Sequence, residues 1–131
     1  MRFQFKELPG TPNDYLRPAV PVVVEGMSRA PQLCLLDTGA LQNRFASWVA
    51  EAAGIDLEGA EEERIAVGGF VALARSASVQ LTLSDVTWEA PVWFCEPWPL
   101  AFHLLGQEGF FRWFEVRLRA AIYQVDIIAE A

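Results

Sequence analysis

The chain has 131 residues, 53% of them hydrophobic, and carries 10 Lys and Arg against 17 Asp and Glu, a formal net charge of −7. This length is typical of one domain with a sizeable core and is too short for two such domains. The acidic balance and the scattered basic residues argue against a nucleic-acid partner, because phosphate contacts need clustered Lys and Arg. We expect a single domain over residues 1–131, in which residues 1–20 form an N-terminal strand and arm.

The sequence contains no recognisable targeting or membrane signal. Residues 1–6 alternate in polarity and lack the long apolar stretch of a signal peptide. No run approaches the roughly 18 apolar residues of a membrane span. Cys34 and Cys95 lie in apolar runs, without close spacing or partner histidines, which predicts buried, reduced thiols. We therefore expect a cytoplasmic protein with no membrane partner.

Short strands dominate the predicted elements of the first half of the chain. In chain order these elements are a strand at Phe3 and Phe5, a break over residues 9–14, a loosely structured arm up to Pro21, a strand over 21–25, a turn over 26–31 and a strand over 32–36. Apolar side chains at helical spacing then predict one short helix that ends at Gly54, namely Phe45, Trp48, Val49 and Ala52.

The second half of the chain also predicts short strands. Apolar segments at residues 65–67 and 70–73 flank the pair Gly68-Gly69, which suits a hairpin turn. Further strands are expected over residues 79–83 and 88–95, and the alternating residues of 114–118 and 123–127 predict a closing hairpin. Many short strands with one or two short helices indicate a mostly β fold of the closed-barrel kind.

The most informative motif is Asp37-Thr38-Gly39-Ala40, which directly follows the apolar run 33–36. A carboxylate at the end of a buried strand is costly to desolvate, so its presence there suggests a site that uses the charge. Gly39 permits close approach of backbone or substrate, and Thr38 adds a hydroxyl that both donates and accepts hydrogen bonds. As a plain turn sequence, Asp-Thr-Gly would need no function.

This motif resembles the active-site loop of the aspartic proteases, and the chain length is that of their single-domain, retropepsin-like branch. Two further landmarks follow in the order typical of that family. The first is Val67, Gly68, Gly69 and Phe70, at the place of the flap, and the second is Leu104, Leu105 and Gly106, which resembles the apolar-apolar-Gly element that pairs with the Asp loop. The resemblance implies that Asp37 is catalytic, that Thr38, Gly39 and Ala40 complete the active-site loop, that residues 67–70 bind substrate, and that residues 104–106 support the site.

A single Asp-Thr-Gly implies a two-fold homodimer. Hydrolysis by carboxylates needs a base and an acid, and two carboxyls that share one proton supply both. The other aspartates lack the apolar lead-in and the following glycine: Asp14, Asp56, Asp85 and Asp126. A two-fold axis would bring Asp37 of each chain together. The resemblance thus implies an acid-protease-like barrel that acts as an aspartic endopeptidase on extended peptides.

The chain departs from the family pattern on both sides of the expected site. Where many members have a small or acidic residue and then Ser or Thr, this chain has Leu41, Gln42 and Asn43, of which Asn43 retains the capacity for a hydrogen bond. Where the family often has Arg followed by Asp or Asn, this chain has Gln107 and Glu108. Loss of the Arg removes the basis for a supporting ion pair and leaves the acid itself unchanged.

A non-catalytic, peptide-binding or regulatory domain of the same fold is the alternative. The intact Asp-Thr-Gly favours the enzyme, because a binding module has no need of an acid there. His103 is the only histidine, which excludes a multi-histidine metal site within one chain and disfavours a Ser-His-Asp triad. We expect His103 to be a polar residue at a strand end, and we expect no metal or cofactor.

Overall fold

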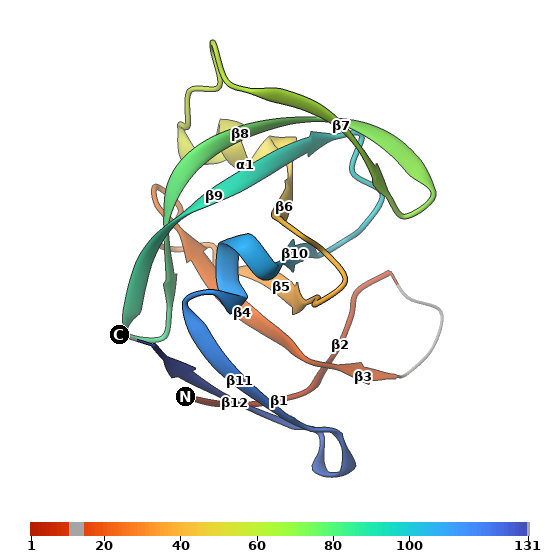
Figure 1. The fold of residues 1–131 in the computed structure, drawn as a ribbon, viewed down its shortest axis with the longest axis vertical. Coiled ribbons are helices and arrows are strands. Elements are labelled where there is room, and N and C mark those ends of the chain that lie inside the picture. The colour runs from red at the N-terminus through yellow and green to blue at the C-terminus, as the bar shows by residue number, and fades with distance from the viewer. Residues whose placement is uncertain (11–14, 131) are drawn as a thin grey trace.

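The computed structural model describes residues 1–10 and 15–130, and strands make up most of it (Figure 1). The strands are β1 (Arg2–Gln4), β2 (Lys6–Glu7), β3 (Leu16–Arg17), β4 (Ala19–Val24), β5 (Gln32–Leu36), β6 (Asn43–Ala46), β7 (Glu62–Val67), β8 (Phe70–Leu83), β9 (Val86–Glu96), β10 (His103–Leu105), β11 (Phe114–Arg119) and β12 (Gln124–Ala129). The helical segments are α1 (Ser47–Ala53), a π-helical turn η1 (Gln107–Phe111) and a 3₁₀ turn η2 (Ala120–Ile122).

Six of these strands close into a barrel in the order β4, β5, β10, β6, β9, β8 and back to β4. The pairs β5–β10 and β6–β9 are parallel, whereas the other neighbours run antiparallel. Strand β7 continues the sheet beyond β8 as the outer half of a hairpin. The mostly β closed barrel predicted from the sequence is therefore confirmed.

The barrel is filled by one set of alternating side chains from its strands. The largest fully buried strand residues include Phe45, Phe94, Leu81 and Leu105, and Phe110 of η1 packs in the same core. The alternation follows from strand geometry, in which successive side chains point to opposite faces. Cys34 and Cys95 are buried free thiols, as predicted, and burial raises the pKa of Cys95 to about 12.

The two chain termini meet in a separate three-stranded sheet of order β1–β12–β11. The Met1 amino group donates to the Ile127 carbonyl at 2.8 Å, and the Phe5 amide donates to the Tyr123 carbonyl at 2.7 Å. Its inner side joins the main core through Val125 and Ile127, both fully buried. A short ribbon of β2 and β3 follows this sheet along the chain.

Two expectations from the sequence differ from the structure. Phe45 lies in β6 rather than in the predicted helix, which begins only at Ser47, because β6 pairs in parallel with β9 and places Phe45 opposite Phe94. The expected loose arm contains paired strands, since β3 pairs with β2 and β4 already begins at Ala19. Most of the break expected over residues 9–14, namely residues 11–14, lies outside the described residues. Among residues 1–10 and 15–130, no helix has the length and apolar character needed to cross a bilayer.

His103 is buried at the start of β10 as a neutral side chain. The Ala46 amide donates to its Nδ1 at 3.2 Å, so the ring proton lies on Nε2, which is 3.0 Å from Gln32 Oε1. The Gln32 amide is itself oriented, because its Nε2 donates to the Ala30 carbonyl at 2.8 Å. The ring stacks on Phe45 with centroids 4.7 Å apart. Burial lowers the pKa of His103 to about 4.

This burial predicts a loss of stability in acid. Because His103 has a lower pKa in the folded state than its ordinary 6.5, the unfolded chain binds the proton more tightly, and stability falls as the pH drops from about 6.5 towards about 4. Over that range we expect wild type to lose about 3 kcal/mol more than a His103→Gln variant. Urea unfolding from pH 7 to pH 4 measures the difference, and parallel pH profiles for the two proteins would contradict the assignment.

Candidate active site

Asp37 lies on a tight turn directly after β5, with its side chain half-buried. Its Oδ1 accepts a hydrogen bond from the Gly39 amide at 2.9 Å, and its carbonyl accepts one from the Ala40 amide at 3.1 Å. Such a turn orients the carboxylate through its own backbone. Within the described part of the chain, no other side chain hydrogen-bonds or ion-pairs with this carboxylate.

Strand β10 fixes the position of this turn. Leu104 and Leu105 pair in parallel with the last two residues of β5, and the Asp37 amide donates to the Leu105 carbonyl at 3.0 Å. Gly106 follows at the point of closest approach, where a Cβ atom would overlap the backbone carbonyl of Gln42 and lie 2.8 Å from that of Ala40. Any side chain at Gly106 would therefore push β10 away from the turn.

The buried side-chain amide of Asn43 holds the segment that follows β10. Asn43 is fully buried; its Oδ1 accepts from the Gly106 amide at 3.0 Å and its Nδ2 donates to the Gly109 carbonyl at 3.0 Å. Trp88 Nε1 donates to that carbonyl as well, at 2.9 Å. A Cβ atom at Gly109 would overlap the Asn43 amide, so the large side chain at position 43 requires the absence of one at position 109.

Gln107 provides a further link where the family pattern has Arg. Its Nε2 donates to the Thr38 carbonyl at 2.7 Å, and its amide donates to the Ala40 carbonyl at 3.0 Å. The next amide, that of Glu108, donates to the Leu41 carbonyl at 2.8 Å. The turn is therefore held by neutral hydrogen bonds, and the Thr38 side chain is left exposed.

Gly68 and Gly69 form the tip of the β7–β8 hairpin. Val67 and Phe70 pair directly across them, and φ is 54° at Gly68 and 83° at Gly69. Positive φ at both central residues is the geometry of a type I′ turn, which glycine adopts without strain. A Cβ at Gly68 would lie 3.0 Å from Pro99 Cγ, so the tip lies against the loop that leads into β10.

The hairpin also contacts the strand that follows the Asp37 turn. Arg44 Nη1 donates to the Ala66 carbonyl at 3.1 Å, and Gln42 Nε2 lies 3.5 Å from Glu63 Oε2. Arg44 Nε and Gln42 Oε1 are buried and lack a partner among the described residues. Because these polar atoms have no partner in the contact, separating the two segments costs little free energy.

These placements bring most of the expected site residues together. Residues 37–40 form the turn, Leu104, Leu105 and Gly106 lie beside it, and the hairpin tip lies over the neighbouring loop rather than in contact with Asp37. Among residues 1–10 and 15–130, no group of three or more His, Cys, Asp or Glu side chains is arranged to hold a metal ion.

The overall structure is similar to a crystal structure of a retropepsin-like aspartic protease from Rickettsia conorii. The TM-score is 0.64 at 14% sequence identity, and the match covers 95% of this chain and 88% of that chain. No protein-family model and no curated protein matches the chain. The chain therefore has the fold of the retropepsin-like aspartic proteases, as its motifs predicted.

Sequence reasoning missed the role of Gly109 and Trp88 and the replacement bond from Gln107. Asn43 was expected only to retain a hydrogen bond, whereas it makes two and is fully enclosed. The only local sign of this arrangement is Gly109, just before the aromatic pair Phe110-Phe111. The residue it packs against, Asn43, lies 66 residues away in sequence.

The Asn43–Gly109 fit predicts a strong coupling. Gly109→Ala should destabilise the protein by roughly 2–4 kcal/mol, because Asn43 must leave its position and lose both hydrogen bonds. In an Asn43→Ala background, the same Gly109→Ala change should cost less than about 1 kcal/mol, because the space is then open. Denaturant unfolding of the four proteins in this double-mutant cycle gives the coupling energy. Additive effects would show that the two positions do not compete for space.

Proposed function

We propose that this chain is an aspartic endopeptidase that acts as a homodimer, with Asp37 of each copy activating the attacking water. The observation that carries the proposal is the Asp37 carboxylate, held in a fixed orientation on a turn that backbone hydrogen bonds tie to residues 105–108. A reacting group needs such positioning, because misplacement by about 1 Å lowers rates strongly.

A second copy completes the chemistry. Two carboxyls that share one proton provide the base for water and the acid for the peptide carbonyl. One chain supplies one of these carboxyls, and the exposed Thr38 side chain leaves the same turn accessible to a partner. Since a two-fold axis places identical residues opposite each other, the pairing needs no further motif.

The β7–β8 hairpin suits an extended peptide as substrate. Its tip carries exposed Phe70 and Val71, and its base is held by an apolar cluster that includes Ile65 and Ala74. A hairpin that closes over a bound peptide excludes water from the reaction. The alternative of a non-catalytic peptide-binding domain would use the same hairpin but would not depend on Asp37.

Replacing Asp37 distinguishes the two functions. Asp37→Asn keeps the acceptor for the Gly39 amide but removes the ionisable group, so peptide cleavage should fall by roughly 10³-fold or more. Asp56→Asn is the matched control, because Asp56 Oδ1 accepts from the Glu58 amide at the same 2.9 Å in an exposed turn. Peptides released from a denatured protein mixture, across acid to neutral pH, give the rates. Equal release by wild type and Asp37→Asn would exclude the aspartic mechanism.

Stiffening the hairpin tip should lower turnover without unfolding the barrel. Gly69→Val places a β-branched residue at a φ of 83°, which strains the turn, although no atom lies within 4 Å of the new Cβ position. Gly69→Asn is the control, because Asn tolerates positive φ. We expect roughly a tenfold or greater loss of kcat/KM for Val and a much smaller loss for Asn. If both variants retained wild-type kcat/KM, the hairpin would not be the substrate flap.

A further inference from the structure

We propose that Arg44 binds an acidic side chain of the peptide, so that the chain selects peptides with Asp or Glu within about three residues of the bond held at Asp37. The inference rests on the proposed function, because it names the substrate class of the same site. Three observations carry it: the position of Arg44 in the sheet, its incompletely bonded guanidinium, and the charges around it.

Strand register places Arg44 and Asp37 on one face of the sheet. Leu104 of β10 pairs with Leu35 of β5 on one side and with Arg44 of β6 on the other. Directly paired residues point to the same face, and so do residues two apart along a strand. Asp37 follows Leu35 by two residues, and its amide continues the ladder by donating to the Leu105 carbonyl at 3.0 Å. Arg44 and Asp37 therefore border the same surface.

The separation between Arg44 and Asp37 fits an extended peptide. Strand β10 lies between β5 and β6, so two strand spacings of about 4.8 Å separate Arg44 from Leu35. Asp37 lies two residues further along β5, which places its Cα roughly 12 Å from that of Arg44. An extended peptide rises about 3.3 Å per residue, and the long arginine side chain covers part of the distance. A peptide residue about three positions from the bond at Asp37 therefore comes within reach of the guanidinium.

The guanidinium of Arg44 is only partly bonded. Its Nη1 donates to the Ala66 carbonyl at 3.1 Å, whereas its buried Nε has no partner among the described residues. Across residues 1–10 and 15–130, Arg44 forms no ion pair with a carboxylate. Arginine has five N–H donors in a planar fork that matches the two oxygens of a carboxylate. Since a buried donor without a partner is costly, a carboxylate bound there would be stabilised.

The β7–β8 hairpin covers this face without neutralising Arg44. Arg44 pairs with Trp93 of β9, and Trp93 packs against Ile65 of β7. By strand alternation Glu63 shares the face of β7 that carries Ile65, but its Oε2 lies 3.5 Å from Gln42 Nε2 instead of pairing with Arg44. A peptide held beneath the hairpin would therefore meet an arginine that has no carboxylate partner of its own.

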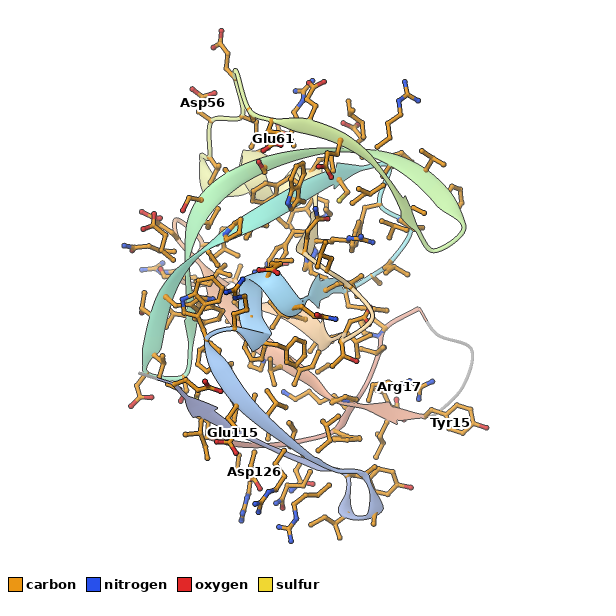
Figure 2. All side chains as sticks on the ribbon, in the orientation of Figure 1. Tyr15, Arg17, Asp56, Glu61, Glu115 and Asp126 are labelled. Carbon is orange, nitrogen blue, oxygen red and sulfur yellow. The ribbon has the colours of Figure 1, made fainter. Side chains whose placement is uncertain are left out.

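The acidic character of the whole chain makes this local contact decisive. The net charge is −7, and Figure 2 shows Asp56 and Glu61 towards one end of the molecule and Glu115 and Asp126 towards the other. Exposed charges more than about 8 Å apart are largely screened at physiological salt. The protein as a whole therefore does not attract an acidic peptide, and selection of one requires direct contact with a cation such as Arg44.

Replacement of Arg44 tests the contact. Wild type should cut synthetic random peptides with Asp or Glu near the bond roughly tenfold or more faster than matching peptides with Asn or Gln there. Arg44→Gln should lose this preference, and Arg44→Glu should prefer Lys or Arg at the same place. Arg64→Gln is the matched control, because it removes the same charge from an exposed position of β7 and should keep the preference. Mass spectrometry of the products gives the residues around each cut.

Binding to the Asp37→Asn protein provides a readout that needs no cleavage. Peptides retained from the same mixture should be enriched in Asp and Glu by roughly tenfold or more, and the double variant Asp37→Asn/Arg44→Gln should lose this enrichment. If this dependence on Arg44 is found while wild type cuts nothing, the inference stands and the proposed catalysis fails. The inference is overturned if wild type and Asp37→Asn show no preference for acidic peptides, if Arg44→Gln keeps the preference, or if Arg64→Gln loses it equally.

Discussion

The close approach of Gly106 to the backbone at Ala40 and Gln42 is the contact on which the candidate site depends. It allows β10 to lie between β5 and β6 and to offer its carbonyl and the amides after it to the Asp37 turn. Because these bonds join backbone groups, they do not depend on the side chains at positions 41, 107 and 108. The departures from the family pattern at those positions therefore leave the turn intact, and Gln107 even adds a bond to Thr38.

Local patterns predicted the parts of the structure that local forces decide. Alternation predicted the closing hairpin of β11 and β12, and the Gly68-Gly69 pair predicted the turn, because a type I′ turn requires positive φ at both positions. Phe45 was assigned to the helix since its spacing fits one, but pairing with β9 outweighed that spacing. The bond between Asn43 and Gly109 could not be read from the sequence, because it joins residues 66 apart through the fold alone.

The β7–β8 hairpin combines a packed apolar face with incomplete polar contacts to the strand after Asp37. Its inner residues, among them Ile65 and Val67, pack on Trp93 of β9 and keep the hairpin in register. Its contacts with the strand after Asp37 are instead one bond from Arg44 and a long one from Gln42, each with an unpaired polar atom beside it. Apolar packing therefore holds the inner face of the hairpin up to Val67, next to the tip, whereas its polar contacts at Glu63 and Ala66 are incomplete.

The barrel and an aspartic mechanism place opposite demands on pH. Carboxyls that share a proton work on the acid side of neutrality, where one of them stays protonated. Burial lowers the pKa of His103 to about 4, so the same acid conditions favour the unfolded chain, which binds that proton more readily. His103 begins β10, the strand that ends next to Gly106 and holds the Asp37 turn. For the proposed dyad, two changes would therefore lower activity in acid, namely protonation of both carboxyls and loosening of β10 as His103 takes up a proton.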